Sequence, residues 1–212
     1  MLLNIARGSQ RLDVVLPKGR FPVIARPLDS QGGKDLEKID GAEGLSAYLD
    51  RVQGDAFFIS NFIDYRAADG QFRKLRVVLV DGRPFAGHMG VSSDWMIHYV
   101  NAGMHESAEK RSEEERFFAT FDEGLAMRHK ESLAAICERV GLDYFSIDCA
   151  EMPDGRLLVF EIDNAGIVHD FDDPAVFPYK PPAMRKVFDA FRAMLADRAA
   201  RSTAVAGAAT AG

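Results

Sequence analysis

Acidic residues on either side of the turn dipeptide Asp154-Gly155 have a spacing that could bring three carboxylates together. If Asp154-Gly155 is a two-residue type I′ turn of a β-hairpin, it sets the pairing of the flanking strands, and Asp148 then faces Glu161. Because side chains alternate between the two faces of a strand, Asp163 shares the face of Glu161. The sequence therefore predicts an acidic cluster of Asp148, Glu161 and Asp163.

Such a cluster has the chemistry of a divalent metal site. Directly opposed residues have Cβ atoms about 4.5–5.5 Å apart, where like charges repel each other. Mg²⁺ or Mn²⁺ would remove the repulsion, because hard cations bind carboxylate oxygens and keep water or phosphate oxygens as further ligands. Two alternatives stay open. The carboxylates could form a solvated face, and a three-residue loop would shift the register and separate Asp148 from Glu161.

The opposite face of the same hairpin is apolar. This alternation is typical of an antiparallel sheet with one buried face. The residues predicted to form the core are Phe145, Ile147, Cys149, Leu158, Phe160 and Ile162.

A second candidate site is a loop that contains glycines. An apolar strand ends in Arg26, and the loop after it contains Ser30, Gly32 and Gly33. Glycines allow backbone N–H groups to approach phosphate oxygens closely. The loop lacks the residue pattern of a Walker motif. Taken alone, it is better explained as an ordinary flexible turn.

Together with the acidic hairpin, this loop resembles the ATP-grasp superfamily, in particular its ligases of the glutathione-synthetase and ribosomal-S6-modification type. The resemblance runs in the same order along the chain from Phe21 to Asp163. Arg26-Pro27 resembles the end of a family strand, and the loop after it resembles the mobile loop that closes over the phosphates of ATP. Arg76 stands where a family hairpin supplies a basic residue toward those phosphates.

The resemblance implies an α+β, ATP-grasp-like fold of antiparallel sheets with flanking helices, and it implies ATP and Mg²⁺ as cofactors. Asp148, Glu161 and Asp163 would hold the metal. Arg76 would be the catalytic residue at the transferred phosphate. The residues implied in ATP binding are Arg26, Ser30, Gly32 and Gly33 at the phosphates and Ser60, Asn61, Phe62 and Ile63 at adenine.

The implied reaction is an ATP-dependent ligation. A substrate carboxylate attacks the γ-phosphate to give an acylphosphate and ADP, and an amine, or a thiol, then displaces phosphate. Positioning and charge neutralisation lower the barrier, so no protein nucleophile is required. The expected partners are small-molecule or peptide carboxylates and amines. His98 and Asn101, in a segment rich in aromatic and polar residues, are the candidates for substrate contact, and a plain loop is the alternative.

The chain also departs from the family pattern. Arg26 stands where Lys is usual, Asn61 where Glu is frequent, and Asp163, followed by Asn164, where Asn is usual. We expect the family's N-terminal domain to be missing, or to be supplied by another chain or a homo-oligomer. The alternatives to a ligase are a non-catalytic or partial ATP-binding module and a non-catalytic interaction domain.

Two other groups receive structural interpretations. His129 lies in the apolar stripe of an expected helix and is interpreted as a packing residue. The acidic run from Val168 to Pro174 is interpreted as a solvated loop rather than a metal site.

The elements that must position these residues follow from the hydrophobic periodicity. Apolar runs predict strands over 12–16, 21–26, 57–63, 73–80 and 83–90 and a strand pair over 144–163, and helical spacing predicts helices over 41–50, 112–121, 125–140 and 184–195. Asp81-Gly82 predicts a tight hairpin turn, and Pro84 predicts an edge strand. Asp40 is the expected N-cap of the first helix, and a capping box at Ser112 is expected to open the second.

Composition restricts the class of protein. With 212 residues, 47% hydrophobic and 27% charged, the chain is typical of a globular protein. We expect a small phosphate-loop (lid) subdomain over 12–55, a larger subdomain over 56–198 and a disordered tail over 199–212. A net charge of −6 without a basic block argues against a nucleic-acid partner, and strand-sized apolar runs argue against a membrane span. Two cysteines without metal-type spacing and no leader sequence predict a cytoplasmic protein.

Overall fold

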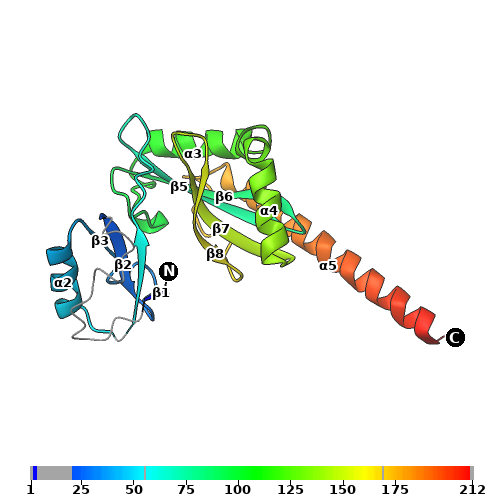
Figure 1. Ribbon diagram of the computed structural model, residues 1–212. Coiled ribbons are helices and arrows are strands. Elements are labelled where there is room, and N and C mark those ends of the chain that lie inside the picture. Colours follow the sequence, from blue (N-terminus) through cyan, green and yellow to red (C-terminus); the bar gives the residue numbers. More distant parts are fainter. Residues whose placement is uncertain (1, 4–20, 55, 169, 211–212) are drawn as a thin grey trace. The chain divides into compact units, whose positions relative to one another are not determined.

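The computed structural model of the chain describes residues 2–3, 21–54, 56–168 and 170–210 (Figure 1). The strand predicted over 12–16 lies outside the described residues. The chain divides into two compact units, unit 1 (Met1–Asp64) and unit 2 (Tyr65–Gly212). Both units contain an antiparallel sheet with helices, so the predicted α+β class is confirmed.

Unit 1 is a four-stranded sheet with one helix. Its strands pair in the order β1-β4-β2-β3, and its elements are β1 (Leu2–Leu3), β2 (Val23–Pro27), β3 (Glu37–Ile39), α2 (Ala42–Arg51) and β4 (Phe57–Asn61). Leu45 and Tyr48 of α2 pack in one core with Val23 and Ile59 of the sheet. The N-cap of α2 is Gly41 rather than the predicted Asp40, and it makes no side-chain cap hydrogen bond.

The boundary between the units lies later than the sequence predicts. Strand β4 pairs with β2, with Ala25 opposite Ile59, so it belongs to the sheet of unit 1. The small unit therefore continues to Asp64 instead of ending at 55.

Unit 2 contains the second four-stranded sheet, in the order β6-β5-β7-β8. Its strands are β5 (Phe72–Val80), β6 (Arg83–Ser92), β7 (Tyr144–Glu151) and β8 (Leu157–Asp163). Asp81 and Gly82 have φ values of 49° and 75°, as a type I′ turn requires, and confirm the predicted hairpin. Pro84 lies on β6 at the edge of this sheet, as predicted.

Helices cover both faces of the unit 2 sheet. They are η2 (Tyr99–Asn101), α3 (Ala108–Thr120), the π-helical turn η3 (Asp122–Ala126), α4 (Lys130–Val140) and α5 (Lys180–Thr210). Phe121 and Leu133, from the α3–α4 layer, pack with Ile147 on one face. Val187 and Met194 of α5 pack with Val78 on the other face. Because neighbouring residues of β7 alternate, Ile147 and Asp148 lie on opposite faces.

Two predicted helix ends are wrong. Helix α3 begins at Ala108, where the Ser107 side chain accepts a hydrogen bond from the Lys110 N–H, and Ser112 lies inside the helix. Helix α5 continues to Thr210, through most of the tail predicted to be disordered. That segment is rich in Ala, the strongest helix former, and it directly extends a packed helix. Among the described residues, no helix is long and apolar enough to cross a membrane.

Candidate functional site

The hairpin of β7 and β8 places Asp148 opposite Glu161 and Ser146 opposite Asp163, as predicted. Its turn is different from the predicted one. The Met152 N–H donates to the Arg156 carbonyl over 2.8 Å, which leaves a three-residue loop between them. Such a loop alone would move Glu161 to the other face.

A β-bulge restores the register. Cys149 pairs with Val159, whereas its neighbour Asp148 pairs with Glu161, so Phe160 is an extra residue in β8. A bulge of this kind changes which face the following side chains occupy. Glu161 and Asp163 therefore return to the face of Asp148 despite the longer loop.

The predicted core of the hairpin is only partly confirmed. Phe145, Ile147 and Cys149 are fully buried, as expected. Phe160 and Ile162 are 40% and 49% exposed, and so are not core residues. They belong to β8, an edge strand of the sheet, and the ring of Phe160 packs against Tyr65 at a centroid distance of 5.0 Å.

The carboxylate of Asp148 is the centre of an ion cluster on this face. Its side chain is 2% exposed. Arg76 Nε donates to Asp148 Oδ1 over 2.7 Å and Nη2 donates to Oδ2 over 3.0 Å, while Lys74 Nζ donates to Oδ2 over 2.8 Å. Burial alone would raise the pKa of the Asp148 carboxyl, but the hydrogen bonds and charges of Arg76 and Lys74 hold that pKa well below its usual range. Asp148 is therefore a permanent anion.

Three neighbouring strands carry this cluster as a row across the sheet. Arg76 of β5 pairs with Asp148 of β7, which pairs with Glu161 of β8. Burial would lower the pKa of Arg76, but the hydrogen bond to Asp148 and the charges of Asp148, Glu161 and Asp163 raise it. The guanidinium thus interacts with all three predicted carboxylates.

A glycine makes room for Arg76. A Cβ at Gly87, the extra residue of a second bulge in β6, would lie 2.9 Å from Arg76 Cγ and 3.1 Å from the Arg76 carbonyl oxygen. Real Cβ contacts are longer than this. Glycine at this position therefore allows Arg76 to lie against the neighbouring strand.

The donor chemistry of this face fits a divalent cation such as Mg²⁺. Carboxylate oxygens are its preferred protein ligands, and the register gives Asp148, Glu161 and Asp163 one face. Ser146, buried beside them, has a hydroxyl oxygen with no hydrogen-bond partner in the part of the chain that the structure describes. Within the described residues, no three Asp, Glu, His or Cys side chains converge as a preformed metal site. Lys74 and Arg76 supply the neutralising charge at Asp148 instead.

Lys74 was not among the predicted site residues. It stands two positions before Arg76 on β5, so both side chains leave the same face of the sheet. The two-residue spacing from Arg76 is the sequence signal that could have identified Lys74 as a site residue.

The predicted phosphate-binding residues lie in unit 1. Arg26 is the penultimate residue of β2, and its Nη1 donates to the Ser30 carbonyl over 3.1 Å, while its guanidinium lies 4.7 Å from the Phe58 ring centroid. The Ser30 hydroxyl donates to the Pro27 carbonyl over 2.9 Å. Gly32 and Gly33 have φ values of 62° and 74°, which favour glycine. The loop is thus held by its own backbone, and its role toward phosphate stays a prediction.

The predicted adenine-binding residues follow along β4 and its end. Ser60 pairs with Ile24, and the Phe62 N–H donates to the Pro22 carbonyl over 3.0 Å. Asn61 and Ser60 have exposed side chains, and so does Ile63. Their role toward adenine is a prediction that the fold leaves open.

The two predicted substrate residues have a local structural role. His98 is the N-cap of η2, and its backbone N–H donates to Asn101 Oδ1 over 3.0 Å in a reciprocal capping box. This contact explains why both polar residues occur there. Their contact with a substrate stays a prediction.

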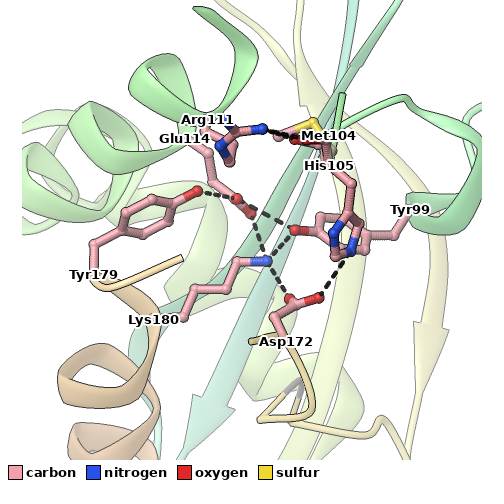
Figure 2. A network of polar contacts seen from close by, with 8 residues as sticks. All are labelled: Tyr99, Met104, His105, Arg111, Glu114, Asp172, Tyr179 and Lys180. Carbon is pink, nitrogen blue, oxygen red and sulfur yellow. Dashed lines mark hydrogen bonds and ion pairs between the residues drawn. The ribbon is translucent and has the colours of Figure 1, made fainter. Parts of the chain in front are cut away.

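A second polar cluster lies deep in unit 2 (Figure 2). Lys180, at the start of α5, is 2% exposed, and its Nζ lies 2.5 Å from Asp172 Oδ2 and 3.4 Å from Glu114 Oε1. It also donates to the hydroxyl of Tyr99, and Tyr179 donates to Glu114 Oε2 over 2.7 Å. The cluster joins η2 and α3 to the segment that leads into α5, which is distant from them in sequence.

This second cluster changes the interpretation of the acidic run from Val168 to Pro174. Asp172 is a partner of the buried Lys180 rather than a solvated residue, and His105 lies 3.7 Å from its other oxygen (Figure 2). The interpretation of His129 as a packing residue is confirmed, because its side chain is buried and its Nε2 lies 2.9 Å from Glu151 Oε1.

Two solved structures with a similar fold are D-alanine–D-alanine ligases. The D-alanine–D-alanine ligase from Coxiella burnetii matches with a TM-score of 0.54 at 11% identity, over 100% of this chain and 56% of the ligase. The D-alanine–D-alanine ligase from Bacillus anthracis matches with a TM-score of 0.54 at 14% identity, over 95% of this chain and 63% of the ligase. No family model matches, and no curated protein shows significant sequence similarity. At these identities the similarity establishes the fold, and the chain spans less than two thirds of either enzyme.

Proposed function

Because the chain has the ATP-grasp fold, we propose that it is the ATP- and metal-binding part of an ATP-dependent carboxylate–amine, or carboxylate–thiol, ligase that works through an acylphosphate. The fold supports the class of reaction, and the charged residues of the unit 2 sheet support the roles assigned below.

The row of Arg76, Asp148 and Glu161 across three strands is the observation that supports this function. Phosphoryl transfer needs cations placed against phosphate oxygens, and metal ligands beside them. A face that joins a half-buried Arg76 with carboxylates supplies both kinds of group. A purely solvated acidic face would not have a buried, doubly paired Asp148 at its centre.

In this proposal Asp148, Glu161 and Asp163 hold Mg²⁺, which when bound neutralises phosphate charge. Arg76 and Lys74 are assigned to the transferred phosphate. Arg26 and the loop with Ser30, Gly32 and Gly33 are assigned to the phosphates of ATP, and the end of β4 is assigned to adenine.

The reaction then needs positioning and charge compensation. A substrate carboxylate oxygen forms a bond to the γ-phosphorus, and the bond to the ADP oxygen breaks. An amine or thiol next attacks the acyl carbon, and inorganic phosphate leaves with the electron pair of its bridging bond. Arg76 stabilises the negative charge that develops on the phosphoryl oxygens. Neither step requires a nucleophilic side chain of the protein.

Calorimetric titration with Mg·ATP tests the proposal. We expect saturable, Mg²⁺-dependent binding to the wild-type chain, and a loss of at least about tenfold in affinity for the Glu161→Gln/Asp163→Asn variant, because a metal ion loses two charged ligands. The matched control is Glu131→Gln/Glu138→Gln, which removes two charges from α4 on the other face of the sheet. Absence of Mg²⁺-dependent ATP binding to the wild type would contradict the proposal.

A non-catalytic ATP-binding module is the alternative to a ligase. ADP release measured over a panel of carboxylic acids with amines or thiols separates the two. Release that depends on both substrates supports the ligase, and tight Mg·ATP binding without release across the panel supports the module.

A further inference from the structure

Lys74 occupies a position at Asp148 that a metal ion would also need. Its Nζ lies 2.8 Å from Asp148 Oδ2, and its side chain is only 15% exposed. The roles assigned to the ligase site above account for the carboxylates and for Arg76. They give Lys74 a role at the transferred phosphate, but they do not explain why its ammonium is held against Asp148.

The oxygen atoms of Asp148 are already engaged. Oδ1 accepts from Arg76 Nε, and Oδ2 accepts from both Arg76 Nη2 and Lys74 Nζ. A metal ion that binds Oδ2 must displace one of these donors. Arg76 is held through two bonds from a planar group, whereas Lys74 is held through one bond from a flexible stem. Lys74 is therefore the donor that leaves at lower cost.

The charge balance of this face also indicates that Lys74 leaves when a metal ion binds. Lys74 and Arg76 oppose three carboxylates on this face, so the five groups have a formal net charge of −1. Addition of a divalent ion would leave the face positively charged while Lys74 stays in place. Without the lysine, the same ion would make the face neutral.

We propose that Lys74 is a built-in counter-ion that occupies the cation position at Asp148 and weakens the binding of free divalent metal, so that the site takes up metal together with nucleotide. The inference rests on the proposed function. Nucleotide phosphates give the Lys74 ammonium another anion to bind, and its release from Asp148 opens Oδ2 for the metal. A metal ion alone offers Lys74 no such partner.

The test is metal binding to the full chain without nucleotide. Mn²⁺ is titrated and the free ion is counted by electron paramagnetic resonance, and Mg²⁺ is titrated by calorimetry. We expect Lys74→Met to bind both ions at least about tenfold more tightly than wild type, because it removes one positive charge from within a few ångströms of the metal. Lys74→Arg keeps the charge and Lys130→Met removes one from α4 on the opposite face, and both should stay within about twofold of wild type.

The outcomes separate this inference from the proposed function. If wild type binds Mg·ATP but Lys74→Met binds free metal no more tightly than wild type, the counter-ion role is wrong and the ligase proposal stands. If wild type shows no Mg²⁺-dependent ATP binding, both are wrong.

A second measurement uses the unaltered chain, in case Lys74→Met does not fold. Lysines labelled with ¹³C at Cε are followed by NMR, and the Lys74 signal is assigned by its absence from the Lys74→Arg spectrum. We expect saturation with Mg·ATP to shift the Lys74 signal. Saturation without any change in that signal would overturn the inference.

Discussion

Asp148 faces Glu161 across β7 and β8 although three residues form the loop between these strands, because Phe160 is an extra residue in β8. The longer loop shifts the register in one direction and the bulge shifts it back. The acidic face therefore depends on two irregularities that compensate each other.

Deletion of Phe160 should preserve the acidic face. Without this residue Val159 still pairs with Cys149 and Glu161 with Asp148, now in a regular ladder. We expect Mg²⁺-dependent ATP binding within about threefold of wild type, and a stability loss of about 1 kcal/mol from the lost ring contact with Tyr65. Deletion of Ile162 is the matched control, because it moves Asp163 to the opposite face. Calorimetry should show retained binding for the first deletion and lost binding for the second; the reverse order would refute the assigned bulge.

Asp148 and Glu161 should differ in what they contribute. Asp148→Asn leaves Lys74 and Arg76 largely buried without their anion, so we expect a stability loss of about 3 kcal/mol in urea unfolding, together with loss of Mg·ATP binding. Glu161 is exposed, so Glu161→Gln should change stability by less than about 0.5 kcal/mol and still weaken Mg·ATP binding. Equal effects of the two substitutions on stability would contradict the ion cluster.

The sequence predicts that the three carboxylates share one face of the hairpin. It does not predict the longer loop and the bulge that together put them there. Alternation along β7 identifies Phe145, Ile147 and Cys149 as core residues. The same rule fails at Phe160, because a bulge adds a residue without any change in composition that would reveal it. The Asp148–Glu161 pair was obtained from a turn that does not form.

Ion pairs between segments that are distant in the chain could not be predicted from the sequence. The Lys180–Glu114 pair joins α5 to α3, and neither residue belongs to a local motif. Lys74 was closer to being found, since the strand period places it beside Arg76. The beginning of α3 shows a different limit: two serines, Ser107 and Ser112, both precede helical sequence with glutamates, and only packing decides between them.

Ser107 and Ser112 give a direct test of that helix start. Ser107 accepts a hydrogen bond from the Lys110 N–H, so Ser107→Ala should destabilise the protein by about 1 kcal/mol. Ser112 is inside α3, where Ala is the better helix former, so Ser112→Ala should be neutral or slightly stabilising. Urea unfolding of the two variants distinguishes them. A larger loss for Ser112→Ala would place the helix start where the sequence alone predicts it.

Lys180 should be far more important for stability than Lys186, an exposed lysine of the same helix. Lys180→Met leaves Glu114 and Asp172 without their cation in a buried site, at a cost of about 3–5 kcal/mol. Lys186, on an exposed position of the same helix, is the matched control, and Lys186→Met should stay within about 0.5 kcal/mol of wild type. Thermal unfolding followed by circular dichroism measures both. Similar melting temperatures for the two variants would refute the structural role of the cluster.

Glu114 should make the protein relatively more stable as the pH falls. Burial raises the pKa of its carboxyl, against the opposing effects of Lys180 and the Met89 N–H, so the folded protein keeps the Glu114 proton to a higher pH than the unfolded chain. A raised folded-state pKa contributes stability that is complete below the unfolded pKa and is lost as the pH rises through the folded one. The unfolding free energy of wild type minus that of Glu114→Gln should therefore decrease from about pH 4.5 upward. Urea unfolding at a series of pH values measures this difference, and a difference that grows with pH would contradict the burial of a proton-binding Glu114.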